Sequence, residues 1–493
     1  MKSSNIFHTM LLLVFLISVS ACTNTSKFLD VNVNPNTPSK STVELTLPTA
    51  QMNTAYSLGN QYQITGGFWA QYWTQGPTAN QYNNLDRYAV TASDFNVERP
   101  WSALYAGALA DYQYVIDEAT KTPEIAKTKG NHAAIAKLMQ AYTFQLLTDL
   151  YGDIPFSEAL KGEKNPAPRF DSQETVYNGL IKLIEEGTAV INEDTEYHPD
   201  AEDLIFHGDM HLWKKFANTL KLKVYMRLSK VKPAFAQAGI AALATAEFLE
   251  TGEDAKIDFT TTTYNRNPLN TTFPALGTGN ILASSTSIQY LNSTNDPRVG
   301  AFYKQATSGN NRNTYVGLRQ GEGKSVVYPS TVLATDWSSS GDLVTGQTAP
   351  VIFISAAESY FLRAEAAVRG WLGGGNAKAL YESGIKASFT RLGVQGATAF
   401  IAQPSIAFPE GGSTNDKIKA IITQKWVAMN GSQTIEAWTE WRRTGYPDFL
   451  MVSTYNQTAG KMPQRLPYPS SEVTRNANIP ALKTILDPVW WQQ

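Results

Sequence analysis

The sequence predicts a predominantly α-helical fold in which helices pair as antiparallel hairpins around a long, loop-rich insertion. Apolar residues recur at i, i+3, i+4 and i+7 in several stretches, a pattern that indicates one buried helix face. Between about residues 233 and 353 this period is lost, and Gly, Asn, Ser, Thr and Pro dominate. Two helix pairs before the insertion and two after it favour four stacked units that are TPR-like, although their spacing is not a regular repeat.

Residues 1–21 have the composition of a lipoprotein signal peptide. Lys2 is followed by an apolar run from Met10 to Val19, and small residues lead directly to Cys22. The run is too short to span a membrane, which takes about 20 apolar residues. We expect the chain to be cut before Cys22 and anchored by acyl chains on that thiol. The alternative is an ordinary secretory signal with an incidental cysteine. Cys22 is the only cysteine, so no intramolecular disulfide can form.

Residues 22–48 are rich in Asn, Thr, Ser and Pro and are expected to form a lipid-anchored tether, followed by a single domain over 49–493. Helices are predicted over about 101–230 and 355–443, with Asp209 as a plausible N-cap. The apolar faces are Leu104, Ala108, Tyr112 and Val115; Ile135, Leu138, Tyr142 and Leu146; Val176, Leu180, Leu183 and Ile184; Trp213, Phe216, Leu220 and Val224; Phe361, Ala364 and Val368; Ile385, Phe389 and Leu392; Ile418, Ile421, Ile422 and Trp426; and Ile435 and Trp438.

The insertion, about 233–353, begins with one expected helix and then becomes irregular. Turn-forming segments such as Asn265-Arg266-Asn267-Pro268 alternate with short β-prone runs such as Ser325-Val326-Val327-Tyr328. Binding residues are found on loops that a rigid scaffold positions. We therefore expect the helices to be scaffold, and the insertion with the N-terminal loops to carry the function.

Composition limits the kinds of partner. The formal net charge is −2 and only 17% of residues are charged, so no basic surplus argues for nucleic acid. Aromatic residues make up 11%, with 23 Tyr and 11 Trp, although most of these rings must fill the core. Rings together with amide and hydroxyl side chains suit polyhydroxylated ligands, whose apolar faces stack on rings.

No catalytic or cofactor motif is recognised. The sequence has no Walker A loop, HExxH or GxSxG, and its one thiol is expected to be lipidated. His207 and His211 are a conceivable metal pair, but zinc sites generally need three or four ligands, and the segment 193–196 lacks the alternating pattern of a calcium loop. Glu436 and Glu440 lie one helical turn apart, a poor arrangement for glycoside hydrolysis, and are expected on a solvated or salt-bridged face. No metal site and no cofactor are predicted.

The preferred candidate ligand residues are rings on polar loops. Trp69 and Tyr72 are expected in the core, whereas Trp73 ends their helix before a loop. Trp337 is the only tryptophan of the insertion and lies where there is no helical period; exposed rings of this kind mark interaction sites. The predicted ligand-binding residues are Trp73, Tyr82, Asn83, Asn84, Trp337, Tyr264, Asn265 and Arg266, each with core packing or plain surface exposure as the alternative.

Several phrases of the sequence resemble the SusD/RagB family of nutrient-binding outer-membrane lipoproteins, and they cover almost the whole mature chain. They are Phe28-Leu29-Asp30-Val31-Asn32 after Cys22; Leu47-Pro48-Thr49-Ala50; Asp149-Leu150-Tyr151-Gly152-Asp153-Ile154-Pro155-Phe156; Trp213-Lys214-Lys215-Phe216-Ala217-Asn218; Asp296-Pro297-Arg298; Glu358-Ser359-Tyr360-Phe361-Leu362-Arg363-Ala364-Glu365; Glu440-Trp441-Arg442-Arg443-Thr444-Gly445-Tyr446-Pro447; and Arg465-Leu466-Pro467-Tyr468-Pro469.

The resemblance implies a SusD-like fold of four TPR-like pairs, held on the outer face of the outer membrane by the lipid on Cys22. It also implies a non-catalytic protein that captures an oligosaccharide, or in some members a peptide, and delivers it to a SusC-like TonB-dependent transporter as its lid. Surface exposure follows from the resemblance rather than from residues 23–27, which carry no acidic side chain. The alternatives are the same architecture with a peptide ligand, a surface glycoside hydrolase, and a structural adaptor.

Overall fold

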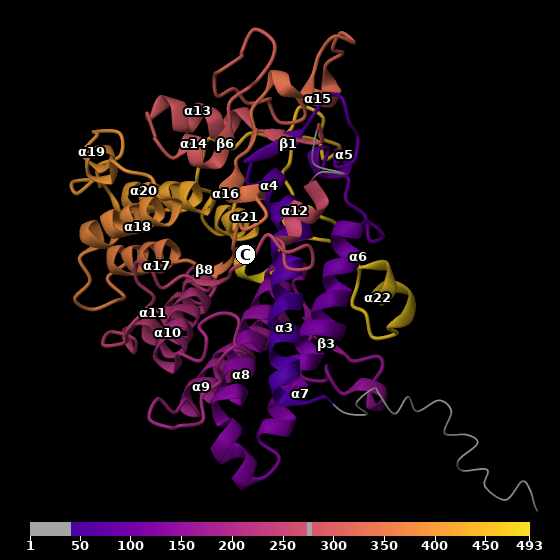
Figure 1. The fold of residues 1–493 in the computed structure, drawn as a ribbon, viewed down its shortest axis with the longest axis vertical. Coiled ribbons are helices and arrows are strands. Elements are labelled where there is room, and N and C mark those ends of the chain that lie inside the picture. Colours follow the sequence, from indigo (N-terminus) through magenta and orange to yellow (C-terminus); the bar gives the residue numbers. More distant parts are fainter. Residues whose placement is uncertain (1–40, 274–278) are drawn as a thin grey trace, which may run out of the picture. The chain divides into compact units, whose positions relative to one another are not determined.

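The computed structural model describes residues 41–273 and 279–493, and helices dominate it (Figure 1). The predictions for the signal peptide, Cys22 and most of the tether fall on residues 1–40, outside the described part. Val43–Gln493 form one unit. Among the described residues, no helix combines the length and the apolar character that crossing a bilayer requires.

The first described helix begins at Val43, inside the segment 22–48 that the sequence predicts to be a tether. α3 (Val43–Ser57) continues through a π-helical turn (Leu58–Tyr62) into α4 (Gln63–Trp69). α6 (Phe95–Ser102) likewise continues through Ala103–Leu109 into α7 (Ala110–Ala119), against which α3 packs. The predicted tether is therefore wrong at its end. Residues 43–48 are helical, because Val43 and Leu47 lie one helical turn apart on a face that is buried.

The remaining helices of the body form two groups, which match the predicted ranges except that the first group ends with the helix expected at the start of the insertion. The first consists of α8 (Pro123–Tyr151), α9 (Gln173–Ala189), α10 (Met210–Arg227) and α11 (Pro233–Ala241). The second consists of α17 (Ala356–Val368), α18 (Ala377–Leu392), α19 (Ala397–Ile401), α20 (Thr414–Met429) and α21 (Thr434–Thr444). The segment after α21 contains α22 (Ser470–Arg475) and a 3₁₀ turn (Trp490–Gln492).

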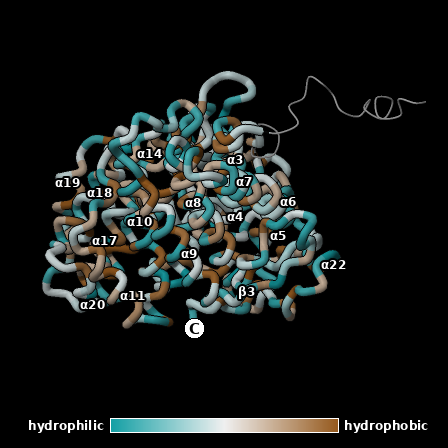
Figure 2. Tube along the Cα trace, turned by 90° about the horizontal axis from the view of Figure 1, so that it is seen from below, coloured by the Kyte–Doolittle hydropathy of each residue, from teal (hydrophilic) through white to brown (hydrophobic). Residues whose placement is uncertain are grey.

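Neighbours in sequence pack together: α7 on α8, α8 on α9, α9 on α10, α17 on α18, and α20 on α21. Hydrophobic and hydrophilic residues alternate along these helices (Figure 2), as amphipathic helices require. Asp209 caps α10 as predicted, because its Oδ1 accepts from the Leu212 amide at 3.0 Å. The predominantly helical fold is confirmed, while the closer likeness to TPR pairs stays a prediction.

The insertion contains short elements joined by loops. Its helices are α12 (Pro268–Thr272), α13 (Ser285–Ser293), α14 (Val299–Phe302), α15 (Glu322–Ser325), a 3₁₀ turn (Ala334–Asp336) and α16 (Asp342–Thr345). Its strands are β4 (Ala255–Ile257), β5 (Ile281–Ala283), β6 (Tyr303–Lys304), β7 (Ser339–Ser340) and β8 (Val351–Ile354). The β-prone run 325–328 is not a strand: Ser325 ends α15, and residues 326–328 continue as a loop in which both valines are exposed.

In the described part of the chain there are four antiparallel strand pairs, most of which join segments far apart in sequence. β4 pairs with β8 and β6 with β7, while β2 (Ile154–Pro155) pairs with β3 (Phe170–Asp171). The pair that matters most for function joins β1 (Trp73–Gln75) to β5, with Trp73 opposite Ala283. It attaches the N-terminal loop, which contains α5 (Asn83–Asp86), to the insertion.

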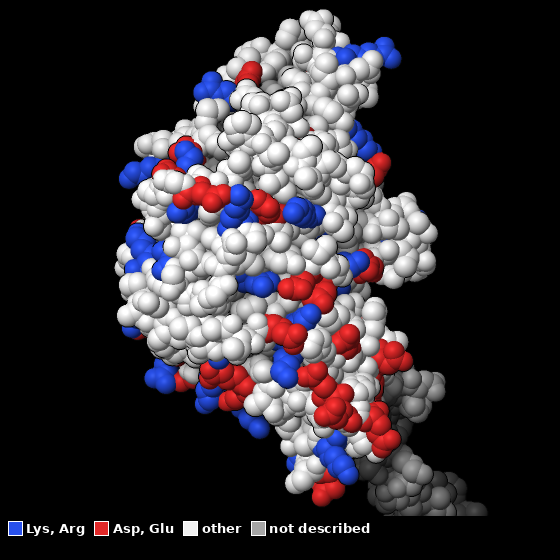
Figure 3. Space-filling view, turned by 90° about the vertical axis from the view of Figure 1, so that its left-hand side faces the viewer, with Lys and Arg blue, Asp and Glu red and all other residues white. Residues whose placement is uncertain are grey.

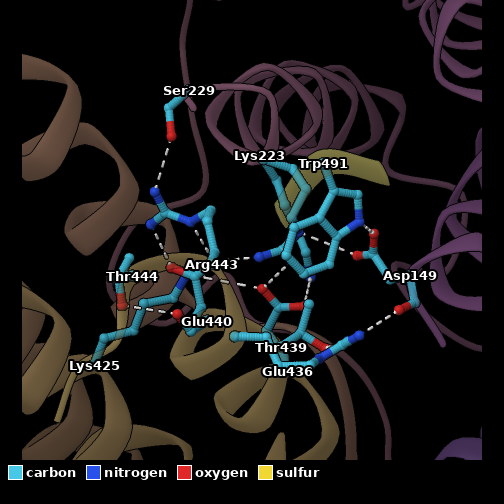
Figure 4. Close-up of polar contacts among 12 residues, drawn as sticks. Asp149, Lys223, Ser229, Lys425, Glu436, Thr439, Glu440, Arg443, Thr444 and Trp491 are labelled. Carbon is cyan, nitrogen blue, oxygen red and sulfur yellow. Dashed lines mark hydrogen bonds and ion pairs between the residues drawn. The ribbon is translucent and has the colours of Figure 1, made fainter. Parts of the chain in front are cut away.

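A network of buried charges connects the two groups of helices (Figure 4). Arg227 of α10 pairs with Asp149 at 3.1 Å, with Glu436 at 2.6 Å, and with Glu440. Arg443 pairs with Glu440 at 2.8 Å. Of the two alternatives predicted for Glu436 and Glu440, the salt-bridged one is confirmed. Both side chains are buried, so the solvated alternative is wrong. The facing cations hold the pKa of both carboxyls below the ordinary value although burial opposes this.

Candidate ligand-binding surface

Two loops meet beside the β1–β5 pair, at the end of the molecule where Figure 1 labels α5, β1 and α15. One is residues 76–84, which follow β1, and the other is residues 324–337, which begin with the last two residues of α15. Lys324 joins them, because its ammonium donates to the carbonyl of Pro77 at 3.0 Å. We call residues 76–84 and 324–337 together the loop surface.

Buried amides fix the backbone of residues 76–84. The Gln75 Nε2 donates to the Ala79 carbonyl at 3.0 Å, and its Oε1 accepts from the Tyr82 amide at 2.8 Å. Asn280 accepts from the Gln81 amide at 2.8 Å. With the backbone held from below in this way, the side chains of Thr78, Asn80 and Gln81 remain exposed to solvent. The loop therefore offers hydroxyl and amide groups on a pre-ordered backbone.

Residues 324–337 present rings and aliphatic side chains. The Trp337 and Tyr328 rings meet edge to face, with centroids 5.5 Å apart and an interplanar angle of 86°. The Tyr328 hydroxyl donates to Glu322 at 2.8 Å, which fixes the ring. Both rings are half-buried, so part of each is open to solvent. Val327, just before Tyr328, is 98% exposed, and Leu333, between the two rings in sequence, is 53% exposed.

The charged groups of this surface already have partners inside the protein. The Asp336 carboxylate accepts from the Ser308 hydroxyl at 2.6 Å and from the Leu333 amide at 3.0 Å, and these bonds lower its pKa. Glu322 accepts from Tyr328, and the ammonium of Lys324 is bound to Pro77. What remains for a ligand is rings, aliphatic side chains, hydroxyls and amides, a neutral set that suits a neutral polyhydroxylated molecule.

A buried carboxyl lies under the surface. Asp86 accepts from the Thr74 hydroxyl at 3.1 and 3.2 Å and from the Gln320 Nε2 at 2.9 Å. Burial raises its pKa to about 7, because the charged form loses its hydration. These contacts join β1 to the residues that lead into α15, so Asp86 supports both halves of the loop surface.

Two of the predicted ligand residues belong to the core. Trp73 has no exposed area, and its ring packs where a side chain on Gly67 would lie. Tyr82 is 1% exposed and packs between Phe68 and Phe95, with centroids 5.8 and 6.2 Å away. The prediction that these rings stack on a sugar is wrong, because Trp73 lies in a buried strand rather than at a helix end. Trp69 and Tyr72 are buried, as expected.

Asn83 and Asn84 lie in α5, at the edge of the loop surface, and both are half-buried. The Asn84 Nδ2 donates to Asp94 at 2.9 Å, and the Asn83 Nδ2 donates to Asn80 at 3.3 Å. Asn84 is therefore engaged in holding its own loop, whereas Asn83 adjoins the exposed Asn80.

Tyr264, Asn265 and Arg266 lie in another place. Tyr264 is 94% exposed, and the Arg266 Nε donates to the Thr261 carbonyl at 3.1 Å. Their loop follows Phe259 in sequence, and the Phe259 ring packs against Tyr56 of α3. Figure 1 shows α12, which follows this loop, away from α15. The structure thus does not group these three residues with Trp337.

Sequence reasoning missed Tyr328, Gln75 and Asn280. Tyr328 follows two valines, a pattern typical of a strand, and a single buried amide such as Asn280 leaves no periodic signal. The other chemical candidates are engaged elsewhere. Among the described residues, no group of three or more His, Cys, Asp or Glu side chains could hold a metal ion. His211 instead pairs with Glu193 at 3.1 Å.

Comparison with known proteins identifies relatives over nearly the whole chain. A family model described as SusD-like, starch-binding and associating with the outer membrane matches residues 35–469. A solved structure described as a chitin-binding protein is 28% identical, with a TM-score of 0.73, over 90% of this chain and 99% of its own. A SusD homologue from Bacteroides uniformis is 26% identical, with a TM-score of 0.74, over 91% and 99%.

A third structure, a chitin-binding SusD homologue from Flavobacterium johnsoniae, is 24% identical with a TM-score of 0.76, over 91% of this chain and 98% of its own. At that identity the likeness concerns the fold. No curated protein matches in sequence.

Proposed function

The chain belongs to the SusD-like family, and on that premise we propose that it is a non-catalytic lipoprotein of the outer membrane that captures a glycan for uptake. The observation that carries this proposal is the loop surface. Its open side chains are the Trp337–Tyr328 ring pair and the neutral groups of Thr78, Asn80 and Gln81. The backbone beneath them is fixed before any ligand arrives.

Recognition would combine stacking with hydrogen bonds. The open part of the Trp337 ring takes the apolar face of a sugar ring, with Tyr328 buttressing it from the edge. Thr78, Asn80 and Gln81 exchange hydrogen bonds with the hydroxyls of the same or the next sugar unit. Because residues 76–84 are held by Gln75 and Asn280, little backbone entropy is lost on binding.

The comparisons suggest which glycans to try first. The family is described as starch-binding, and one structure at 28% identity is described as chitin-binding. Both polymers are neutral, in keeping with a surface whose charged groups are paired internally. Maltohexaose and N-acetylchitohexaose are therefore the first probes. Oligopeptides are the rival ligand class, and the same screen decides between them.

Delivery would require a partner and an anchor. We propose that the chain is lipidated on Cys22 and covers a SusC-like TonB-dependent transporter as its lid. The exposed Val326, Val327 and Leu333 of the loop surface offer apolar area for such a contact. Replacing Cys22 with Ala should move the folded protein from the membrane fraction to the soluble fraction. Tagged mature protein, extracted in mild detergent, should bring down a protein of transporter size.

Titration of the mature chain with the two oligosaccharides and with oligopeptides tests the binding proposal. Trp337→Ala should weaken glycan binding by about 1–3 kcal/mol, by analogy with base stacking on aromatic side chains. Trp371→Ala, which removes another half-buried tryptophan in the connection after α17, should leave the affinity unchanged. If Trp337→Ala and Trp371→Ala bind the oligosaccharide equally well, the loop surface is not the glycan site. If the chain binds oligopeptides and no oligosaccharide, its ligand is a peptide.

A further inference from the structure

A cavity lies among the helices, apart from the loop surface. It has a volume of about 560 Å³ and opens between α13, α20 and the connection from α19 to α20. Phe449, in the segment after α21, closes one side. Figure 1 shows α13 above α20 with α19 beside them, away from α5 and α15. A ligand in this cavity would therefore not touch Trp337.

Stacked rings form one wall of the cavity. Tyr290 of α13 and Phe449 lie parallel, with centroids 5.0 Å apart and an interplanar angle of 18°. Trp426 of α20 meets both rings with its edge, at 5.9 and 5.4 Å. Tyr290 and Phe449 are half-buried, so the stack is held by Trp426 from behind and keeps part of its surface open. Rigid, partly open rings are what the apolar face of a sugar packs on.

A chain of hydrogen bonds determines whether the Tyr290 hydroxyl donates or accepts a hydrogen bond in the cavity. The buried Arg298 donates from Nη2 to the Gln424 Oε1 at 2.9 Å, which fixes the side-chain amide. The Gln424 Nε2 must then donate to the Tyr290 hydroxyl oxygen, 3.1 Å away. That oxygen is an acceptor here, so its own hydrogen is free to donate into the cavity. Burial raises the pKa of Tyr290 to about 12, so the hydrogen is retained at neutral pH.

Two further features of the lining favour a neutral polar ligand. Thr423 lines this cavity, and its hydroxyl has no hydrogen-bond partner among the described residues. At the rim, Lys419 pairs with Asp448 at 2.6 Å, and Asp416 accepts from the Ser413 hydroxyl at 2.7 Å. The charged groups at the rim thus already have partners within the protein, one an ion pair and the other a hydroxyl, and an ionic ligand would have to compete with these contacts.

We propose that this cavity is a second sugar-binding site, which takes one or two rings of a neutral glycan on the Tyr290–Phe449 stack. The free hydroxyls of Tyr290 and Thr423 bind sugar hydroxyls, and the Lys419–Asp448 pair lines the entrance. A polysaccharide held here and at the loop surface at once would be retained far more strongly than at either site alone. The proposal does not depend on the loop surface, because no residue is shared between the two.

The test uses the mature chain carrying Trp337→Ala, so that the loop surface is weakened. Saturation-transfer NMR is recorded with glucose, N-acetylglucosamine, maltohexaose and N-acetylchitohexaose as probes. We expect at least one probe to bind, and Tyr290→Phe, which keeps the stack and removes one donor, to weaken that binding about two- to tenfold. Thr423→Trp should abolish it by filling the cavity. Tyr56→Phe in α3 is the matched control, expected to have no effect.

Each outcome bears on one site. Binding that neither Tyr290→Phe nor Thr423→Trp alters, or no binding of any probe to the Trp337→Ala chain, overturns the second site. If Trp337→Ala binds as tightly as wild type while Tyr290→Phe binds weakly, the second site holds and the loop surface does not. Thr423→Val, which removes only a hydroxyl, replaces either variant that shows a lowered melting temperature.

Discussion

The helical body and the loop surface use polar side chains in opposite ways. In the body, charges are buried and pair across helices, as Arg227 does with Asp149, Glu436 and Glu440. Beneath the loop surface, the neutral amides of Gln75 and Asn280 are buried and hold its backbone, while rings and aliphatic side chains of the surface face solvent. A buried charge is stable only where a rigid scaffold places an opposite charge beside it. Neutral side chains left exposed on a fixed backbone can instead bind a ligand at little entropic cost.

The external charges follow the same division. Figure 3 shows Lys, Arg, Asp and Glu gathered over the middle and lower parts of the face that it presents, whereas the upper part carries few of them. The upper part belongs to the insertion. A mostly uncharged end on a body with matched charges is consistent with binding that depends on shape and stacking, with a modest response to salt.

The largest effect is expected in the body. Arg227→Leu leaves three buried carboxylates without their shared cation, which should lower the free energy of unfolding by about 3–5 kcal/mol. Urea unfolding, followed by circular dichroism, measures it. Lys304→Leu, which breaks an exposed pair with Asp342, is the matched control and should change stability little. A similar small loss in both variants would mean that the buried network contributes no more than a surface pair.

The next effect concerns pH and the support beneath the loop surface. The pKa of Asp86 is raised to about 7, so the folded state keeps a proton that the unfolded state releases above about pH 4. Stability from this group is therefore complete below pH 4 and is lost as the pH rises towards 7. Asp86→Asn should remove this loss, changing the slope by up to about 1.4 kcal/mol per pH unit.

Unfolding in urea at several pH values between 4.5 and 7.5 measures that slope. Asp258→Asn, which removes an exposed carboxylate instead, controls for the change in net charge. Parallel curves for wild type and Asp86→Asn would show that Asp86 is charged in the folded protein at these pH values.

The smallest effect is expected at Tyr328. Tyr328→Phe keeps the ring beside Trp337 but loses the hydrogen bond to Glu322, which frees a carboxylate at the edge of the surface. We expect glycan affinity to fall by about 0.5–1.5 kcal/mol with the melting temperature nearly unchanged. Calorimetric titration measures the affinity. If Tyr328→Phe binds the glycan as tightly as wild type, the Tyr328 hydroxyl plays no part in binding and only its ring packing matters.

Much of the fold could be predicted because it depends on local patterns. The helical faces and the cap at Asp209 follow from residues within a few turns of each other. The start of α3 is not predicted, although Val43 and Leu47 have helical spacing, because the Asn, Thr and Pro residues just before them are typical of an extended segment.

The site was harder to predict, because burial is decided by distant residues. Trp73 and Trp337 both lie next to polar segments in sequence. Trp73 is buried through its pairing with Ala283, some two hundred residues away, and through the space that Gly67 leaves. Trp337 stays partly open beside Tyr328. No local pattern distinguishes these two tryptophans.

The central claim, that ligand binds at Trp337 and not at Trp73, is tested most directly by chemical protection. Mature protein is oxidised with N-bromosuccinimide, with and without the best oligosaccharide of the screen, and each tryptophan is quantified by peptide mass spectrometry. We expect Trp337 to be oxidised in free protein and protected by the oligosaccharide, Trp371 to react equally in both samples, and Trp73 to be inert throughout. Oxidation of Trp337 at the same rate with saturating ligand would contradict it.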